Sequence, residues 1–247
     1  MKAFLFELCV ETLQAAQAAE LGGADRIELC ERLDIGGVTP GEMLISTTIQ
    51  ALSIPVHVLI RPRCGDFVYS AAEFDQMKQQ IQWVKQAGAA GVALGVLLGD
   101  GRVDVDRSRE LVELACPMKV TFHRAFDRTP DMSEALEAVI RAGADCLLTS
   151  GGAPNVLTGA KQLKTLVIQA GNRIQIMAGG GLKLASVNEV LEQTGLRCLH
   201  GSLIRKAGER FPKSVIPDLS NGQASILEHD VRTAVRIMSG HFAAEMI

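Results

Sequence analysis

Short apolar runs alternate with longer amphipathic stretches along the whole chain. A sequence motif of a glycine, a small residue and an apolar run recurs at Gly23–Leu29, Gly88–Leu94 and Gly143–Thr149, with a weaker copy at Thr194–His200. Each copy follows a stretch rich in Ala, Leu and Glu, so its glycine predicts a helix C-cap and its apolar run predicts a buried strand. Four further strand candidates lie between the copies, at Ala3–Val10, Pro55–Arg61, Met118–Ala125 and Arg173–Ala178.

Interleaving the two sets predicts eight strands separated by helices at roughly 12–21, 40–51, 71–86, 104–115, 131–141, 155–169, 183–193 and 224–239. One copy of this motif for every two strand–helix units is typical of a (β/α)8 or TIM barrel. The alternative is a doubly wound open sheet, which needs a glycine-rich turn after an early strand, and the turn after Val10 has no glycine. We therefore predict an α/β fold with one domain over residues 1–247, in which 203–247 form a C-terminal loop and the last helix. The polar segment 205–212 is expected to lie over the barrel mouth.

Polar residues occupy one face of the predicted strands. Successive strand residues point to opposite sides, and the other face carries Leu, Val, Ile and Phe. The polar face is therefore predicted to point into the barrel, where buried charges need one another. Glu7 and Glu28 are expected to face Arg61, which leaves a purely structural role open. Three histidines, His57, His123 and His200, converge on the mouth, which is where TIM barrels carry their chemistry.

Two segments predict an anion site at that mouth. Arg61 and Arg63 end the third strand around a proline, and the planar fork of arginine matches a carboxylate or phosphate. Gly179, Gly180 and Gly181 follow strand seven, and Gly201 and Ser202 follow strand eight, where barrels of this kind commonly bind phosphate on backbone N–H groups. The alternative for the arginines is a pair of structural salt bridges.

The cysteines suggest a second kind of site. Cys9 and Cys30 lie on neighbouring strands with inward parity, and strands about 4.8 Å apart would let two thiols at matched height share one soft ion. Cys198 is placed to join them, and burial as ordinary core residues is the alternative. Cys116 and Cys146 are predicted to be core residues. The six cysteines form no C-x-x-C pair, which favours reduced thiols in a cytoplasmic protein.

Composition narrows the functional classes. Hydrophobic residues make up 47% of the chain, the formal net charge is −3, and there is one Trp and one Tyr. Nucleic-acid binding would require a basic face with aromatic residues, so it is not expected. No apolar stretch reaches the roughly 18 residues of a membrane span. Residues 1–10 predict a first strand rather than a signal peptide, because Glu7 interrupts the apolar run.

Several long motifs together resemble the CutC copper-homeostasis family. They are Glu7–Cys9, Ala24–Cys30, Gly36–Pro40, His57–Arg63, Gly65–Phe67, Tyr69–Ser70, Thr121–Asp127, Leu148–Gly151 and Met177–Gly179. The resemblance implies a cytoplasmic TIM barrel, a homodimer or larger homo-oligomer, and a copper(I) role. It also implies that Cys9 and Cys30 are the copper ligands. The tail after Ser202 is the least typical part.

Two functional hypotheses follow. The first is a copper-homeostasis protein that binds Cu(I) through thiolates. The second is an enzyme for a small anionic or phosphorylated metabolite, with His123, Glu28 and His57 as catalytic candidates for acid–base work. In that case Arg61 and Arg63 would clamp the substrate, and the Gly179–Gly181 loop would bind its phosphate.

Overall fold

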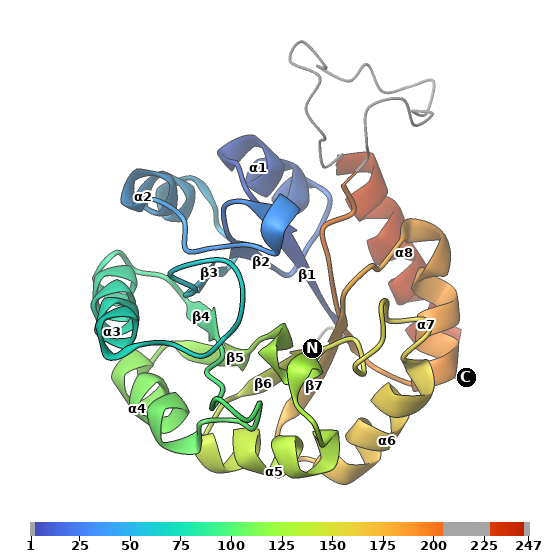
Figure 1. The fold of residues 1–247 in the computed structure, drawn as a ribbon. Helices are drawn as coiled ribbons and strands as arrows, with labels where there is room; N and C mark the ends of the chain where they lie inside the picture. Colours follow the sequence, from blue (N-terminus) through green and yellow to red (C-terminus); the bar gives the residue numbers. More distant parts are fainter. Residues whose placement is uncertain (1–2, 205–227, 245–247) are drawn as a thin grey trace.

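Eight parallel strands close into a ring in the computed structural model, which describes residues 3–204 and 228–244 (Figure 1). The strands are β1 (Leu5–Val10), β2 (Arg26–Leu29), β3 (Val56–Leu59), β4 (Gly91–Leu94), β5 (Lys119–Phe122), β6 (Cys146–Thr149), β7 (Gln175–Gly179) and β8 (Cys198–Gly201). They pair in sequence order, and β8 pairs with β1 to close the barrel. The predicted TIM barrel is confirmed, and the open sheet is excluded.

Helices surround the ring (Figure 1); the first seven connect successive strands, and the last follows β8. They are α1 (Leu13–Leu21), α2 (Glu42–Ala51), α3 (Ala71–Gln86), α4 (Val105–Ala115), α5 (Met132–Ala142), α6 (Ala160–Ala170), α7 (Val187–Thr194) and α8 (Glu228–Ala244). Local signals fix several ends. Thr12 caps α1, Ser70 and Glu73 form a capping box on α3, and Gly143 ends α5 in the left-handed conformation.

Two helices begin later than predicted. The chain before α6 forms turns, in which Asn155 Oδ1 accepts a hydrogen bond from the Thr158 N–H at 3.0 Å, so the helix starts at Ala160 rather than near 155. A 3₁₀ turn (Leu184–Ser186) takes the first residues expected of α7. The predicted segment 205–212 and the first residues of the predicted last helix, 224–227, lie outside the described residues.

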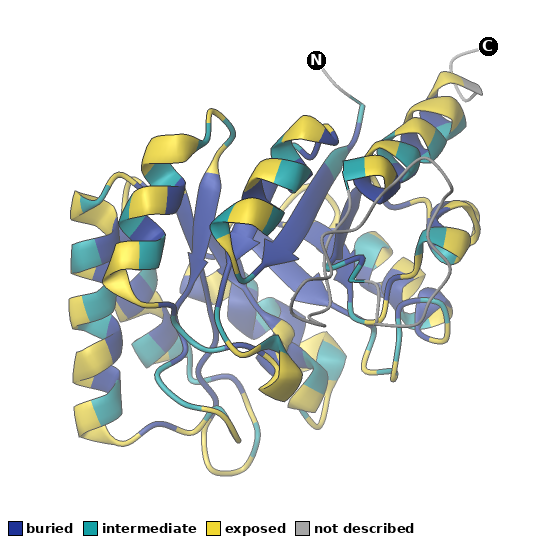
Figure 2. Ribbon diagram, turned by 90° about the horizontal axis from the view of Figure 1, so that it is seen from above, coloured by how far each residue is buried: buried dark blue, intermediate teal, exposed yellow. Residues whose placement is uncertain are grey.

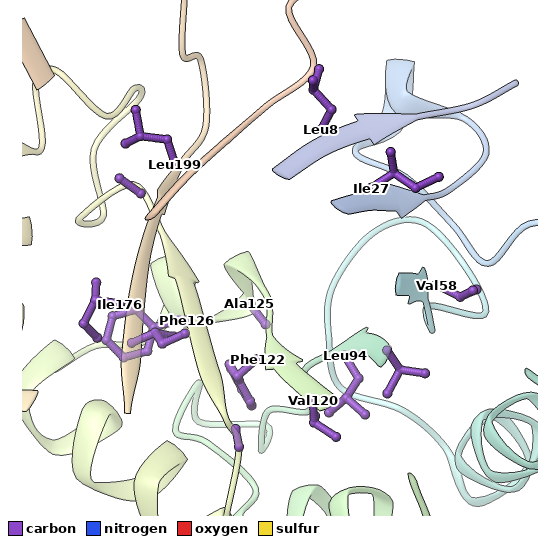
Figure 3. Close-up of a cluster of buried hydrophobic side chains, with 14 of the residues drawn as sticks. Leu8, Ile27, Val58, Leu94, Val120, Phe122, Ala125, Phe126, Ile176 and Leu199 are labelled. Carbon is purple, nitrogen blue, oxygen red and sulfur yellow. The ribbon is translucent and has the colours of Figure 1, made fainter. Parts of the chain in front are cut away.

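The main hydrophobic core lies between the strands and the helices. Alternate strand residues such as Leu8, Val58 and Val120 are fully or almost fully buried and point away from the barrel axis (Figure 3). The helices turn buried faces towards the strands and exposed faces outwards (Figure 2). This is the layered packing that the alternation of apolar and polar positions predicts. Over residues 3–204 and 228–244, no helix combines the length and apolar character needed to span a bilayer.

The barrel interior is packed by the other set of strand residues. Two small apolar clusters lie there, one around Cys9, Cys30, Leu59 and Ala93 and the other around Cys146, Leu148, Met177 and Cys198. Most of the remaining inward positions are polar. β4 and the residue just after it are exceptional, because their inward positions Gly91, Ala93 and Gly95 are small.

The small residues of β4 make room for two imidazole rings. A Cβ at Gly91 would lie 2.5 Å from the His57 ring, and a Cβ at Gly95 would lie 2.6 Å from the His123 ring. Both distances are too short for non-bonded atoms. The lack of a side chain at Gly91 and Gly95 is therefore what allows His57 of β3 and His123, directly after β5, to be buried.

We expect Gly91→Ala to destabilise the protein by about 1–3 kcal/mol, because the added methyl must displace a buried ring in a closed barrel. Gly99→Ala is the matched control. It lies in the loop after β4 with open space around the position, so we expect a change within about 0.5 kcal/mol. Urea unfolding at neutral pH measures both. Equal stability of the two variants would contradict this account of the interior.

Candidate functional site

A buried ion cluster ties three neighbouring strands together inside the barrel. Glu7 on β1 stands opposite Arg26 on β2 and opposite His200 on β8. Arg26 Nε donates to one carboxylate oxygen of Glu7, and His200 Nδ1 lies 2.7 Å from the other. Burial alone would raise the pKa of Glu7, but the Arg26 charge and the His200 hydrogen bond outweigh it and lower that pKa to about 2. Glu7 is therefore ionised and fully paired.

The predicted partnership of Glu7 and Glu28 with Arg61 is wrong for both carboxylates, since neither is paired with Arg61 among the described residues. Arg61 follows the end of β3, and its guanidinium donates to the carbonyl oxygens of Gly36, Gly37 and Gly65 at 3.1, 2.7 and 2.9 Å. It thus lies at the level of the mouth loops, above the layer that Glu7 occupies. Arg26, which has the same inward parity as Glu28, is the residue that neutralises Glu7.

The two thiols of the predicted metal site meet at the mouth. Cys9 Sγ lies 3.3 Å from Cys30 Sγ, and both residues are buried. They are not at matched height as predicted, since the register sets Cys9 opposite Glu28 and Cys30 one residue pair further on. Strand tilt in a barrel produces such a stagger, and the side chains converge across it.

Glu28 and His200 lie beside the thiols. The Cys9 thiol donates to Glu28 Oε1 at 3.6 Å, and ligand atoms of Cys9, Glu28 and His200 all lie within 4.8 Å of one another. Because Nδ1 of His200 is held by Glu7, its Nε2 is the nitrogen available to an ion. A carboxylate that orients a histidine in this way is a common support of metal ligands. The donor set is two sulfurs, one nitrogen and one carboxylate oxygen.

Burial shifts the acid–base chemistry of this group. The neighbouring Cys30 thiol, followed by burial, raises the pKa of Cys9 well above its usual value. Burial likewise raises the pKa of Glu28, whose Oε2 has no hydrogen-bond partner among the described residues. Burial opposes protonation of His200, yet its hydrogen bond with Glu7 and the Glu28 charge raise its pKa. The free site therefore holds protons that a bound cation would displace.

Two cationic side chains, Arg61 and Arg124, and the neutral His123 also line the mouth. His123 Nδ1 accepts a hydrogen bond from the Ala125 N–H at 3.2 Å, and burial, helped by the Arg61 charge, lowers the pKa of His123 to about 3. Arg124 Nε donates to Asp127 at 2.8 Å and its Nη2 to Ser150 Oγ at 3.2 Å. The Arg124 guanidinium lies against Gly180, where a Cβ would come within 2.7 Å of it.

Both groups of side chains line one cavity of about 320 Å³. Most predicted site residues line it: Cys9, Glu28, Cys30, Arg61, His123, Gly180, Gly181, Gly201 and Ser202. Three do not. His57 is buried against Gly91, and Gly179 packs against Leu148 and His200. Arg63 turns outwards to Asp66 and Glu73, so it forms the structural salt bridges that were the alternative.

The remaining cysteines are separate from the thiol pair. Cys198 lies opposite Leu5 in the second interior cluster with Cys146, so the structure does not bring it to Cys9. Cys146 is buried as predicted, whereas Cys116 is exposed at the end of α4, contrary to the prediction.

Sequence reasoning overlooked the roles of Arg26 and Arg124. Arg26 belongs to the motif Ala24–Cys30 and shares the parity of Glu28, so strand alternation could have placed it inside the barrel. Arg124 directly follows β5 and His123, a position typical of functional residues in this fold. No sequence signal links Arg124 to Gly180.

Comparison with known proteins agrees with a TIM barrel that carries a thiol pair at its mouth. The CutC family profile matches residues 4–205, and the chain belongs to the CutC family. It is 46% identical to a CutC family protein of Caulobacter vibrioides over 198 residues, which cover 80% of each chain. It is 40% identical to the human copper homeostasis protein cutC homolog over 241 residues, 96% of this chain and 88% of the human one.

A solved structure supports the same assignment. The crystal structure of a CutC protein from Streptococcus agalactiae superposes with a TM-score of 0.77 at 30% identity. The match covers 81% of this chain and 98% of that one. The family resemblance seen in the motifs is therefore confirmed.

The buried ion pair predicts a large effect of one neutral substitution. Glu7→Gln keeps the shape of the side chain but leaves Arg26 as an uncompensated buried charge, so we expect a loss of about 3–5 kcal/mol in the free energy of unfolding. The double variant Glu7→Gln, Arg26→Met should recover part of this loss. Urea unfolding of the three proteins provides the test, and a double variant less stable than Glu7→Gln would refute the pairing.

His123 predicts a specific pH dependence. Its pKa is about 3 in the folded protein against about 6.5 when exposed, so its contribution to stability is complete above pH 6.5 and declines as pH falls towards 3. Each pH unit removes about 1.4 kcal/mol. His123→Phe should therefore reduce the stability loss between pH 7 and pH 5 by about 2 kcal/mol. The exposed His229→Gln is the control and should leave that loss unchanged. Denaturant midpoints at the two pH values decide the matter.

Proposed function

We propose that the protein acts in copper homeostasis by binding one Cu(I) ion at the barrel mouth through Cys9 and Cys30, with His200 as a third ligand. The observation that carries the proposal is the pair of buried thiols 3.3 Å apart at the edge of the mouth cavity. Thiolate sulfur prefers soft Cu(I) to hard cations such as Mg²⁺. The copper-homeostasis names of the human and mouse relatives point the same way.

The surroundings of the thiols suit an ion that displaces protons. Thiolates are the ligand form, and both Cys9 and Glu28 hold protons more strongly than usual in the free protein. Binding should therefore release protons, and affinity should rise with pH.

The compartment follows from the oxidation states involved. All six cysteines are free, and Cu(I) is the reduced form of the ion. A reducing compartment preserves both, which favours a cytoplasmic location.

Competition titration with a Cu(I) chelator under reducing conditions tests the proposal. We expect the native protein to bind one equivalent, and Cys9→Ser, Cys30→Ser to bind at least about a hundredfold more weakly. His200→Gln should weaken binding by roughly 10–100-fold, the range typical for disturbed metal sites. The matched control is Cys146→Ser, Cys198→Ser, which removes two other buried thiols from the barrel interior and should bind like the native protein.

Equal affinity of the native protein and the Cys9→Ser, Cys30→Ser variant would rule out the site. So would an affinity too weak to compete with a millimolar thiol reagent. Loss of binding in the Cys146→Ser, Cys198→Ser variant instead would indicate that the ligands lie in the second interior cluster.

A further inference from the structure

The mouth cavity has more room than a metal ion needs. Its volume is about 320 Å³, whereas one water takes roughly 30 Å³ in the liquid. Cavities that hold small organic ligands begin at about 300 Å³. The thiol pair occupies one side only, and the opposite side, around His123 and Arg124, is lined by residues that have no part in binding copper.

Arg61 places an uncompensated positive charge at this cavity. It is 5% exposed, and its guanidinium donates hydrogen bonds to backbone carbonyl oxygens, with the guanidinium carbon 4.9 Å from the centre of the Phe67 ring. Among the described residues no carboxylate pairs with it. Carbonyl oxygens orient a guanidinium without neutralising it, and a buried charge without a counter-ion is costly. An anion in the cavity would compensate it.

Arg124 adds a second guanidinium whose position is fixed. Asp127 and Ser150 hold two of its nitrogens, which leaves Nη1 without a hydrogen bond among the described residues. Asp127 also accepts hydrogen bonds from Thr149 and from the N–H groups of Ser150 and Gly152, so its charge is spread over several donors. Gly180 has a φ of +112° and no Cβ, which lets the guanidinium lie directly against the loop backbone.

His123 supplies a neutral donor of defined direction. The Ala125 N–H occupies Nδ1, so the single proton of the neutral ring is on Nε2. The His123 side chain lines the cavity. Its Nε2 is buried and has no hydrogen-bond partner among the described residues. A buried donor without an acceptor is unfavourable, and a ligand oxygen would satisfy it.

We propose that the cavity binds a small organic oxyanion, a carboxylate or a phosphate ester, with its charged group at Arg124 and the Gly180–Gly181 backbone and another oxygen on His123 Nε2. The anion would also compensate the buried positive charge of Arg61, whereas Arg63 does not contribute to the site. The site is separate from the thiol pair, so it does not depend on copper binding.

Thermal unfolding at constant ionic strength tests this site. Inorganic phosphate and malonate serve as the probes and chloride as the reference, since a ligand that binds only the folded state raises the melting temperature. We expect phosphate or malonate to give a saturable increase in the native protein, and the more effective probe identifies the charged group of the ligand. Arg124→Gln should bind at least about tenfold more weakly. Arg63→Gln, a loss of the same charge outside the cavity, and Cys9→Ser, Cys30→Ser should respond like the native protein.

Absence of any increase with either probe would overturn the proposal. Equal responses of Arg124→Gln and the native protein would do so as well, as would equal loss in Arg124→Gln and Arg63→Gln, which would indicate non-specific charge effects. Nitrogen NMR of the imidazoles in the native protein is independent of variant folding. The Nε2 signal of His123 should shift on addition of the effective probe, and an unchanged signal would refute its role.

Discussion

The burial of Glu7 is the constraint on which the rest of the interior depends. A carboxylate inside a barrel needs a compensating charge, and Arg26 and His200 supply it from the two flanking strands. The cluster therefore holds β8, β1 and β2 in one register. Cys9 follows Glu7 by one inward position, and Glu28 follows Arg26 by one, so the register fixed by the ion pair also sets the thiols against Glu28. Stability and candidate chemistry share the same residues.

The strands contribute side chains of different size and chemistry to the barrel interior, so the mouth has one region rich in histidine and another rich in thiols and carboxylates. The small residues of β4 let the histidines of β3 and β5 fill the centre, while the side of β1 and β2 carries thiols and carboxylates. Arg61 and Arg124 line the same cavity as Glu28 and the thiols, so its wall carries positive charge as well as soft sulfur atoms. The proposed soft cation and the proposed oxyanion would take separate places here, because each would be stabilised by groups that disfavour the other.

Much of the fold could be predicted from the sequence, because the alternation of strand residues and the recurring glycine motif follow directly from local geometry. The eight strands, the inward parity of Glu7, Cys9 and His200, and the family could all be predicted. Pairing across the barrel could not. The partners of Arg61 are loop carbonyls, which carry no residue signature, and the stagger of Cys9 and Cys30 depends on strand tilt. The late start of α6 depends on a turn at Asn155 that overrides a helical composition.

The order of the donors along the chain matters for biosynthesis. Both thiols of the pair lie within the first 30 residues, but His200 and the strand that closes the barrel come 170 residues later. At ribosomal speeds of about 5–20 residues per second, a growing chain would carry both thiols for roughly 10–30 s before its last donor emerges. During that interval it has neither the proposed third ligand nor the closed barrel wall that excludes water. If the protein binds Cu(I) as proposed, tight capture of the ion would coincide with completion of the fold, and an unfinished chain would be a poor sink for the metal.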